Sequence, residues 1–229
     1  MKIGILAVAL LFTAFPTLAQ DKADDRLKNS YKVLKEILEM PDKGIPRDLL
    51  NKSVCVIVYP SVLKAAFIVG GSYGRGVITC RIGEGHNGPW SPPAMFALEG
   101  GSFGLQIGGQ ATDFVLLVMN DSGANSVLSS KVKLGADASV AAGPVGRDAS
   151  AETDIVLRAE ILSYSRARGV FAGVSLEGST MRSDEGANKA LYGKELSAKQ
   201  IVQGGLVKAP AAGLPLIHLL DKVCPRHAK

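Results

Sequence analysis

The amino-acid sequence predicts an α+β fold built around a curved, mainly antiparallel, glycine-rich sheet with a barrel-like shape. Residues 24–40 have the periodicity of an amphipathic helix, whereas residues 54–181 consist mostly of short apolar or alternating runs in which glycine recurs. The segment after residue 184 returns to helical patterns. Helices first, strands in succession and helices last is the order of an α+β domain rather than of repeated βα units. Glycines inside strands favour bends, hence the expected curvature.

The first 19 residues are predicted to be a secretory signal peptide. Lys2 is followed by an apolar run that contains Pro16 and ends in small residues at Ala19. This run is too short for a membrane span and is interrupted by proline. We therefore expect cleavage near Ala19 and an exported protein, periplasmic or secreted, that could also associate with a membrane. Residues 20–229 would then form a single domain.

An amphipathic helix is expected next. Its apolar positions share one face, and basic and acidic residues lie off that face. The apolar stripe consists of Leu27, Tyr31, Leu34 and Leu38, widened by Ile37. Pro41 and Gly44 should end this helix, and a short helix with Pro46 in its first turn should follow.

The middle of the chain is predicted to be mainly strand. Residues 54–60 form a β-branched apolar run that should end as a buried strand at Pro60, followed by a turn or short helix over 61–66. Residues 67–82 and 94–120 are expected to be long, glycine-studded strands separated by a loop. A helix is expected over 122–130. Two further strands or hairpins are expected, one within 131–146 and one within 161–181.

The C-terminal segment is expected to be a helical extension. Residues 184–193, 197–204 and 211–223 carry the patterns of three helices, and Ser197 is suited to cap the second. The three cysteines permit one disulfide in an oxidising compartment. We expect Cys55 to pair with Cys80, because each lies in or beside a strand of the same sheet, which leaves Cys224 over.

Two five-residue segments match the Gly-x-Ser-x-Gly pattern of serine hydrolases, at residues 70–74 and 100–104. A nucleophile elbow needs a strand, a sharp turn and then a helix, but both segments continue as strand patterns. Ser102, Asp154 and His218 follow one another in the order Ser, Asp, His that a hydrolase triad requires, but the sequence around them contains no pattern that supports a triad. We therefore interpret these glycines as bends in strands and expect a protein that is not an enzyme, with a serine hydrolase as the less favoured alternative.

Composition and motifs point away from cofactors and nucleic acid. The sequence contains no phosphate-binding loop, no strand-turn-helix Gly-x-Gly-x-x-Gly and no CxxC or HxxxH spacing for a metal. The formal net charge is +5, or +4 once Lys2 is removed with the signal peptide, and no run of lysines or arginines forms a nucleic-acid arm. We expect no cofactor, no metal and no nucleic-acid partner.

Four runs in the same order resemble the SYLF-domain family, an actin-binding or lipid-binding module. They are KAAFIVGGSYGRGV, EGGSFGLQIGGQATDFVLLVMN, KLGADASVAAGPVG and SRARGVFAGVSLEGSTM, and the resemblance covers about residues 25–192. It implies a non-catalytic binding module. Eukaryotic members are associated with phosphoinositide membranes and, in fungi, with actin, whereas bacterial members are exported and labelled lipid-binding. The predicted signal peptide favours a bacterial exported member and a general anionic-lipid role in the envelope.

The resemblance also implies a membrane-binding role for the N-terminal amphipathic helix. Its cations, Arg26, Lys28, Lys32 and Lys35, would face lipid phosphates, while Leu27, Tyr31, Leu34, Ile37 and Leu38 would enter the headgroup layer. Among the arginines in or beside strands, Arg75, Arg81, Arg166 and Arg168, the guanidinium of Arg75 is retained as a candidate phosphate ligand.

Three alternatives to this site stay open. The helix could instead pack its stripe on the sheet, as most amphipathic helices do. A cavity lined by Phe67, Phe96, Phe103, Phe114 and Phe171 could hold an acyl chain, although these side chains suit a core equally well. The module could also be structural, binding a protein partner or itself.

Overall fold

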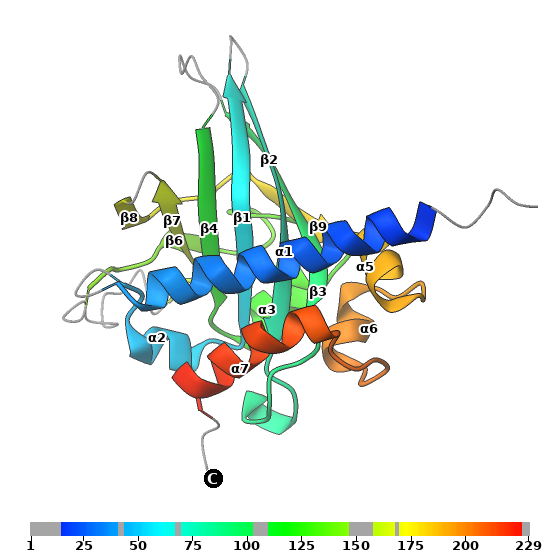
Figure 1. Ribbon diagram of the computed structural model, residues 1–229. Helices are drawn as coiled ribbons and strands as arrows, with labels where there is room; N and C mark the ends of the chain where they lie inside the picture. Colours follow the sequence, from blue (N-terminus) through cyan, green and yellow to red (C-terminus); the bar gives the residue numbers. More distant parts are fainter. Residues whose placement is uncertain are drawn as a thin grey trace, which may run out of the picture.

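A curled nine-stranded sheet forms a half-barrel, and helices cover it (Figure 1). The computed structural model describes residues 15–40, 44–66, 70–102, 110–146, 158–167 and 170–225. Its elements are α1 (Phe15–Leu38), α2 (Arg47–Lys52), β1 (Cys55–Ala66), β2 (Gly70–Cys80), η1 (Glu84–His86), β3 (Ala94–Ser102), β4 (Gln110–Val118), α3 (Asp121–Val127), β5 (Lys131–Lys133), β6 (Val140–Ala142), β7 (Ile161–Ala167), β8 (Val170–Gly173), β9 (Thr180–Ser183), α5 (Glu185–Tyr192), α6 (Ala198–Gln203), η2 (Ala211–Gly213) and α7 (Leu214–Val223).

The strand order in the sheet is β5-β9-β3-β2-β1-β4-β7-β6, and β8 also pairs with β7. Every pairing is antiparallel except that of β6 with β7. The predicted fold class is therefore confirmed. The segment 131–146 does contain two strands, but they do not pair with each other as a hairpin: β5 lies beside β9, and β6 beside β7.

Both faces of the sheet are buried where the helices cover it. Along β1, Cys55, Ile57 and Tyr59 belong to one core, which α3 and α6 help to form. The intervening Val56 and Val58 belong to a second core on the opposite face, which α1, α2 and α7 cover. Side chains of a strand point alternately to its two faces, so a strand buried on both faces has no polar alternation. This explains the continuous apolar run at the start of β1.

The prediction that this strand ends at Pro60 is wrong. β1 continues to Ala66, and the register with β4 shifts between Tyr59 and Val62. The extra residue of this bulge places Ser61 at φ 54°, and its N–H donates to Asp113 Oδ1 at 2.9 Å. A bulge tolerates a proline that a regular central strand would not. The segment 61–66 is accordingly strand, and not the expected turn or short helix.

The prediction of one long strand over 94–120 is also corrected. β3 and β4 occupy separate places in the sheet, β3 between β2 and β9 and β4 between β1 and β7. The remaining predicted helices are confirmed, and Ser197 caps α6 in a capping box with Gln200. Alternation and caps are local signals, whereas the place of a strand in a sheet depends on its partners.

Cys55 and Cys80 are register partners on β1 and β2 and form a disulfide, as predicted. The third cysteine, Cys224, is a buried free thiol, and burial raises its pKa to about 12. At the other end of the chain, α1 begins at Phe15 and so runs through the predicted cleavage site, which stays a prediction. Among the residues that the structure describes, no helix is both long and apolar enough to cross a membrane.

Candidate interaction surface

The apolar stripe of α1 is part of the protein core. Leu27, Leu34 and Ile37 are fully buried, and Tyr31 and Leu38 pack against the same core. In Figure 1, α1 crosses the sheet and α7 runs beside it, and the two helices are in contact. The alternative of packing on the sheet is therefore the one observed in this structure, and insertion of the stripe into lipid stays a prediction. Burying these side chains against the sheet removes them from water as effectively as a membrane would.

The first half of α1 is fixed to the fold by an ion pair that was not expected from the sequence. Arg26, predicted to face lipid, is buried and its Nη1 donates to Asp184 Oδ2 at 2.9 Å. Asp184 also caps α5 by accepting from the N–H of Ala187. Two charged groups that satisfy each other at low exposure are not available to a ligand. Arg26 is therefore a structural residue.

The second half of α1 is held by a three-residue network. The guanidinium of Arg166 on β7 donates to Glu36 on α1 and, at 2.8 Å, to Asp113 on β4. Burial acts to lower the pKa of Arg166, but the hydrogen bonds to both carboxylates outweigh it and raise the pKa. Because Asp113 also accepts from Ser61, this network links α1 to the bulge of β1.

The outer face of α1 carries the lysines that the sequence singled out. We call Lys28, Lys32 and Lys35 the lysine face, and all three are exposed. Lys28 lies 3.7 Å from Asp25 and Lys35 lies 3.8 Å from Glu39, both as exposed pairs. Exposed pairs of this kind contribute little, so the lysines can exchange these partners for others. Lys222 on the adjacent α7 is also exposed.

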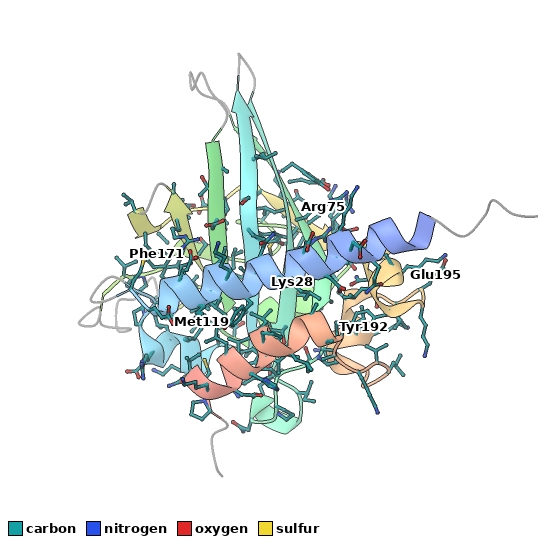
Figure 2. All side chains as sticks on the ribbon, in the orientation of Figure 1. Lys28, Arg75, Met119, Phe171, Tyr192 and Glu195 are labelled. Carbon is teal, nitrogen blue, oxygen red and sulfur yellow. A yellow bond between two sulfur atoms is a disulfide. The ribbon has the colours of Figure 1, made fainter. Side chains whose placement is uncertain are left out.

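Arg75 lies apart from the lysine face, on β2. Figure 2 shows it above α1, with Lys28 on α1 itself. Its Nε donates to the hydroxyl of Tyr73 at 2.8 Å and lies 3.8 Å from Asp184. The hydrogen bond with Tyr73 raises the pKa of Arg75. Arg75 is half exposed, so it is within reach of an anion, but it belongs to the sheet rather than to the helix.

The serine patterns lie in strands. Ser72 is in β2 opposite Gly100, and its Oγ donates weakly to the Gly100 carbonyl at 3.4 Å. Ser102 ends β3, and Asp154 lies outside the described residues. β2 continues from Ser72 to Cys80, so the strand-to-helix turn that a nucleophile elbow requires is lacking at Ser72. Residues 103–109, which follow Ser102, lie outside the described part of the chain, so the interpretation of the second match stays a prediction.

The glycines of β2 allow neighbouring atoms to approach closely. A Cβ on Gly76 would lie 2.2 Å from the Val58 carbonyl oxygen, and one on Gly74 would lie 2.4 Å from a methyl group of Val62. These two positions flank the bulge of β1. Gly74, which ends the first Gly-x-Ser-x-Gly match, and Gly76, which lies just after it, therefore make room for the irregular strand beside them.

Three of the candidate cavity-lining phenylalanines, Phe96, Phe114 and Phe171, are buried core residues. Phe67 and Phe103, with Arg168, lie outside the described part of the chain. Within the described ranges, no group of three His, Cys, Asp or Glu side chains could hold a metal ion. The carboxylates that hold α1 in place were not predicted from the sequence. Asp184 and Arg26, for example, are 158 residues apart, so no local pattern indicates that they pair.

Comparison with known proteins places the chain in a family. Residues 99–223 match a family described as "Ysc84: Las17-binding protein actin regulator". The chain is 36% identical over 185 residues to Protein YSC84 and 35% identical over 183 residues to LAS seventeen-binding protein 3, both of Saccharomyces cerevisiae. It is 30% identical over 206 residues to the human SH3 domain-containing YSC84-like protein 1.

These matches cover 79%, 79% and 87% of the chain but only 38%, 39% and 59% of the relatives. The chain thus spans less than two thirds of each relative. All three relatives are eukaryotic, so the expected bacterial origin stays a prediction. The family match and the resemblance drawn from the four glycine-rich runs agree: the chain belongs to the Ysc84 family, the family of the SYLF domain.

Proposed function

We propose that this chain is a non-catalytic binding module that attaches to anionic phospholipid membranes through the lysine face of α1. The observation that supports this is that the two faces of one helix have different surroundings. The apolar face of α1 is buried against the sheet and α7, and ion pairs hold it there, whereas Lys28, Lys32 and Lys35 point to solvent. A helix anchored in this way attracts anions without inserting.

This arrangement makes a specific physical prediction about the binding mode. Each lysine near an anionic membrane contributes about 1 kcal/mol, and the attraction decays within a Debye length. Because the apolar stripe of α1 from Leu27 to Leu38 packs against the core, charge must supply the affinity of this part of the helix. Binding should therefore be weak, dependent on anionic lipid and strongly reduced by salt.

Cosedimentation with liposomes tests the proposal. Residues 20–229 are mixed with vesicles of neutral lipid, and with vesicles containing phosphatidylglycerol, across a salt series. We expect binding only to the anionic vesicles, and its loss in the Lys28→Glu, Lys32→Glu, Lys35→Glu variant. A matched control carries the same charge change at Lys131, Lys133 and Lys199, which are exposed on other elements. Equal loss in both variants would mean that net charge, and not the lysine face, governs binding.

A second candidate is an acidic protein partner, and the names of the relatives favour it. The family is described as Las17-binding and actin-regulating. The same lysine face could bind an acidic surface such as that of an actin filament, since lysines provide charge without a shape of their own. Cosedimentation of the wild type and both triple variants with actin filaments distinguishes the two candidates. If the wild type binds filaments through the lysine face but does not bind anionic vesicles, the partner is the protein and not the lipid.

Export is a separate part of the proposal. The signal-peptide prediction requires the chain to be cut after Ala19, which would remove the first turn of α1 and leave the packed part, from Ala23 onward, intact. Intact-mass measurement of the protein recovered from the native host tests this. A mature chain that starts at Gln20 supports export, whereas a chain that retains Met1–Ala19 overturns it.

A further inference from the structure

A cavity of about 420 Å³ lies at the end of the sheet that carries the disulfide. Its lining comes from three parts of the chain: the end of α2 with the residues that follow it, the region of η1, and the residues before α3. The lining residues are Asn51, Lys52, Ser53, Val54, Arg81, Gly85, His86, Asn87, Met119, Asn120 and Asp121. Figure 2 labels Met119 among them. The volume is within the range of pockets that bind small molecules.

The lining contains two cations, Lys52 and Arg81, and a single carboxylate, Asp121. That carboxylate is already engaged, because His86 Nε2 lies 2.5 Å from Asp121 Oδ1. The other ring nitrogen, His86 Nδ1, lies 3.1 Å from the Arg81 carbonyl oxygen.

Arg81 is a buried cation without an ion-pair partner among the described residues. Only 3% of it is exposed, and its guanidinium lies 4.7 Å from the centre of the Trp90 ring. Its Nη2 donates to the carbonyls of Cys224 at 2.6 Å and Pro225 at 3.3 Å, and its Nη1 donates to the Gly88 carbonyl at 3.3 Å, so its partners are neutral. Its Nε is buried without a hydrogen-bond partner. Asp221 acts on it electrostatically, but no ion pair joins them. Burial lowers the pKa of Arg81, as expected of a charge that lacks a counter-ion.

The cavity is also held firmly. Two lining residues are the direct chain neighbours of the bonded cysteines: Val54 precedes Cys55 at the start of β1, and Arg81 follows Cys80 at the end of β2. The N–H of Arg81 donates to the Val54 carbonyl at 2.8 Å. Asn120 is fixed as well, because its Oδ1 accepts from the N–H of Gly123 and thereby leaves its NH₂ group as a donor. The donors are therefore in place before any ligand arrives.

We infer that this cavity binds a small molecule bearing a phosphate or carboxylate group. Such an anion would neutralise Lys52 and supply the counter-charge that Arg81 lacks, and the amide of Asn120 would donate to its oxygens. Hydrogen bonds between charged groups are the strong ones, and guanidinium and ammonium groups are the usual ligands of oxyanions. The site is separate from the lysine face and does not depend on it.

Titration with inorganic phosphate at constant ionic strength, followed by amide chemical shifts, tests this inference. We expect saturable shifts confined to Arg81 and to residues 51–54, 85–87 and 119–121. Lys52→Gln removes one exposed cation of the lining and should weaken binding about tenfold, which is the worth of one charged hydrogen bond. The control Lys131→Gln, an exposed lysine on β5, should leave the affinity unchanged. Shifts that do not saturate, or that Lys52→Gln leaves unaltered, would overturn the inference.

Two further experiments identify the source of the anion and control for misfolding of the variants. Glycerol 3-phosphate represents a free headgroup, and vesicles containing phosphatidylglycerol present it on a membrane. If Lys52→Gln also weakens vesicle binding, the ligand is a lipid headgroup. If it weakens only the binding of the soluble probe, the ligand is a free metabolite. Arg81→Lys keeps the charge and loses the planar fork, so a folded Arg81→Lys protein with undiminished phosphate binding would exclude Arg81 from the site.

Discussion

The two halves of β1 pair with the same strands but differ in how far their side chains are buried. Residues 55–59 are buried between two helix-covered faces, whereas among the side chains described beyond the bulge, Ser61 and Leu63 are exposed and Val62 is buried. Figure 1 shows β1 and β2 extending well beyond α1. Leu63 is 62% exposed, and its register partner Tyr73 on β2 is 42% exposed. The bulge at Pro60–Ser61 is the border between a two-faced core and a projecting ribbon.

This difference shows that strands of this sheet can stay hydrogen-bonded to each other where their side chains are no longer buried. The ladder of β1 with β2 continues past the bulge to Ala66 and Gly70. Stability, however, should be concentrated where both faces are packed, because burial of apolar area is the dominant favourable contribution to folding. Substitutions of the same kind in the two halves should therefore differ sharply in cost.

The largest expected effect is that of Gly76→Ala in the buried half. The new Cβ would lie 2.2 Å from the Val58 carbonyl oxygen and 2.9 Å from Tyr59 Cα, so backbone must move. We expect a loss of about 3 kcal/mol in the free energy of unfolding, measured by urea denaturation. The matched control is Gly71→Ala in the projecting half of the same strand, where the nearest atom is 3.8 Å from the new Cβ. Equal costs at Gly71 and Gly76 would contradict the comparison.

The next effect concerns the disulfide that closes the buried end. Cys55 and Cys80 are separated by 25 residues, and a loop of this size corresponds to about 3 kcal/mol in the chain-entropy description. The Cys55→Ala, Cys80→Ala variant should lose about that amount. Adding a reductant to the wild type should have the same effect, while the reductant should leave the double variant unchanged. A reductant-sensitive double variant would show that Cys224, and not this bond, is responsible.

How far the sequence predicts this architecture depends on the range of each signal. The cysteine pair, the cap Ser197 and the stripe of α1 were predictable, because strand membership, capping and helical periodicity are local. The bulge at Ser61 was not, since it depends on an acceptor in β4, Asp113. The same holds for the candidate surface: the exposure of the lysine face follows from periodicity, but the burial of Arg26 follows from Asp184, far along the chain.

A smaller effect depends on pH and concerns Glu160, beside the start of β7. The hydroxyl of Ser122 donates to this carboxylate, and the N–H of Ser139 donates at 2.7 Å. The hydrogen bond from Ser122, with those from Ser139, lowers the pKa of Glu160 below its ordinary value, against an opposing effect of burial. The ionised form is thus favoured by folding, so its contribution is present above the unfolded pKa and is lost as the pH falls through the lower, folded pKa.

Glu160→Gln should therefore lower the free energy of unfolding at neutral pH by at most about 1 kcal/mol, allowing for solvent screening of a partly exposed group. The difference from wild type should shrink in acid, which thermal unfolding at several pH values measures. Glu177→Gln, at an exposed glutamate in the turn before β9, serves as the control and should show no such trend. A pH-independent difference at Glu160 would point to packing instead of charge.

The smallest effect is expected at Leu63, and it tests the projecting half directly. Leu63→Ala removes more carbon than Val62→Ala, yet Leu63 is 62% exposed and Val62 is fully buried. Val62→Ala should cost about 2 kcal/mol, from lost burial and the cavity left behind, while Leu63→Ala should stay within about 0.5 kcal/mol. Urea denaturation at several protein concentrations measures both. If Leu63→Ala were as costly as its neighbour, and more so at higher concentration, the projecting ribbon would be covered in solution by a second copy of the chain. The border at the bulge would then mark an interface rather than the end of the core.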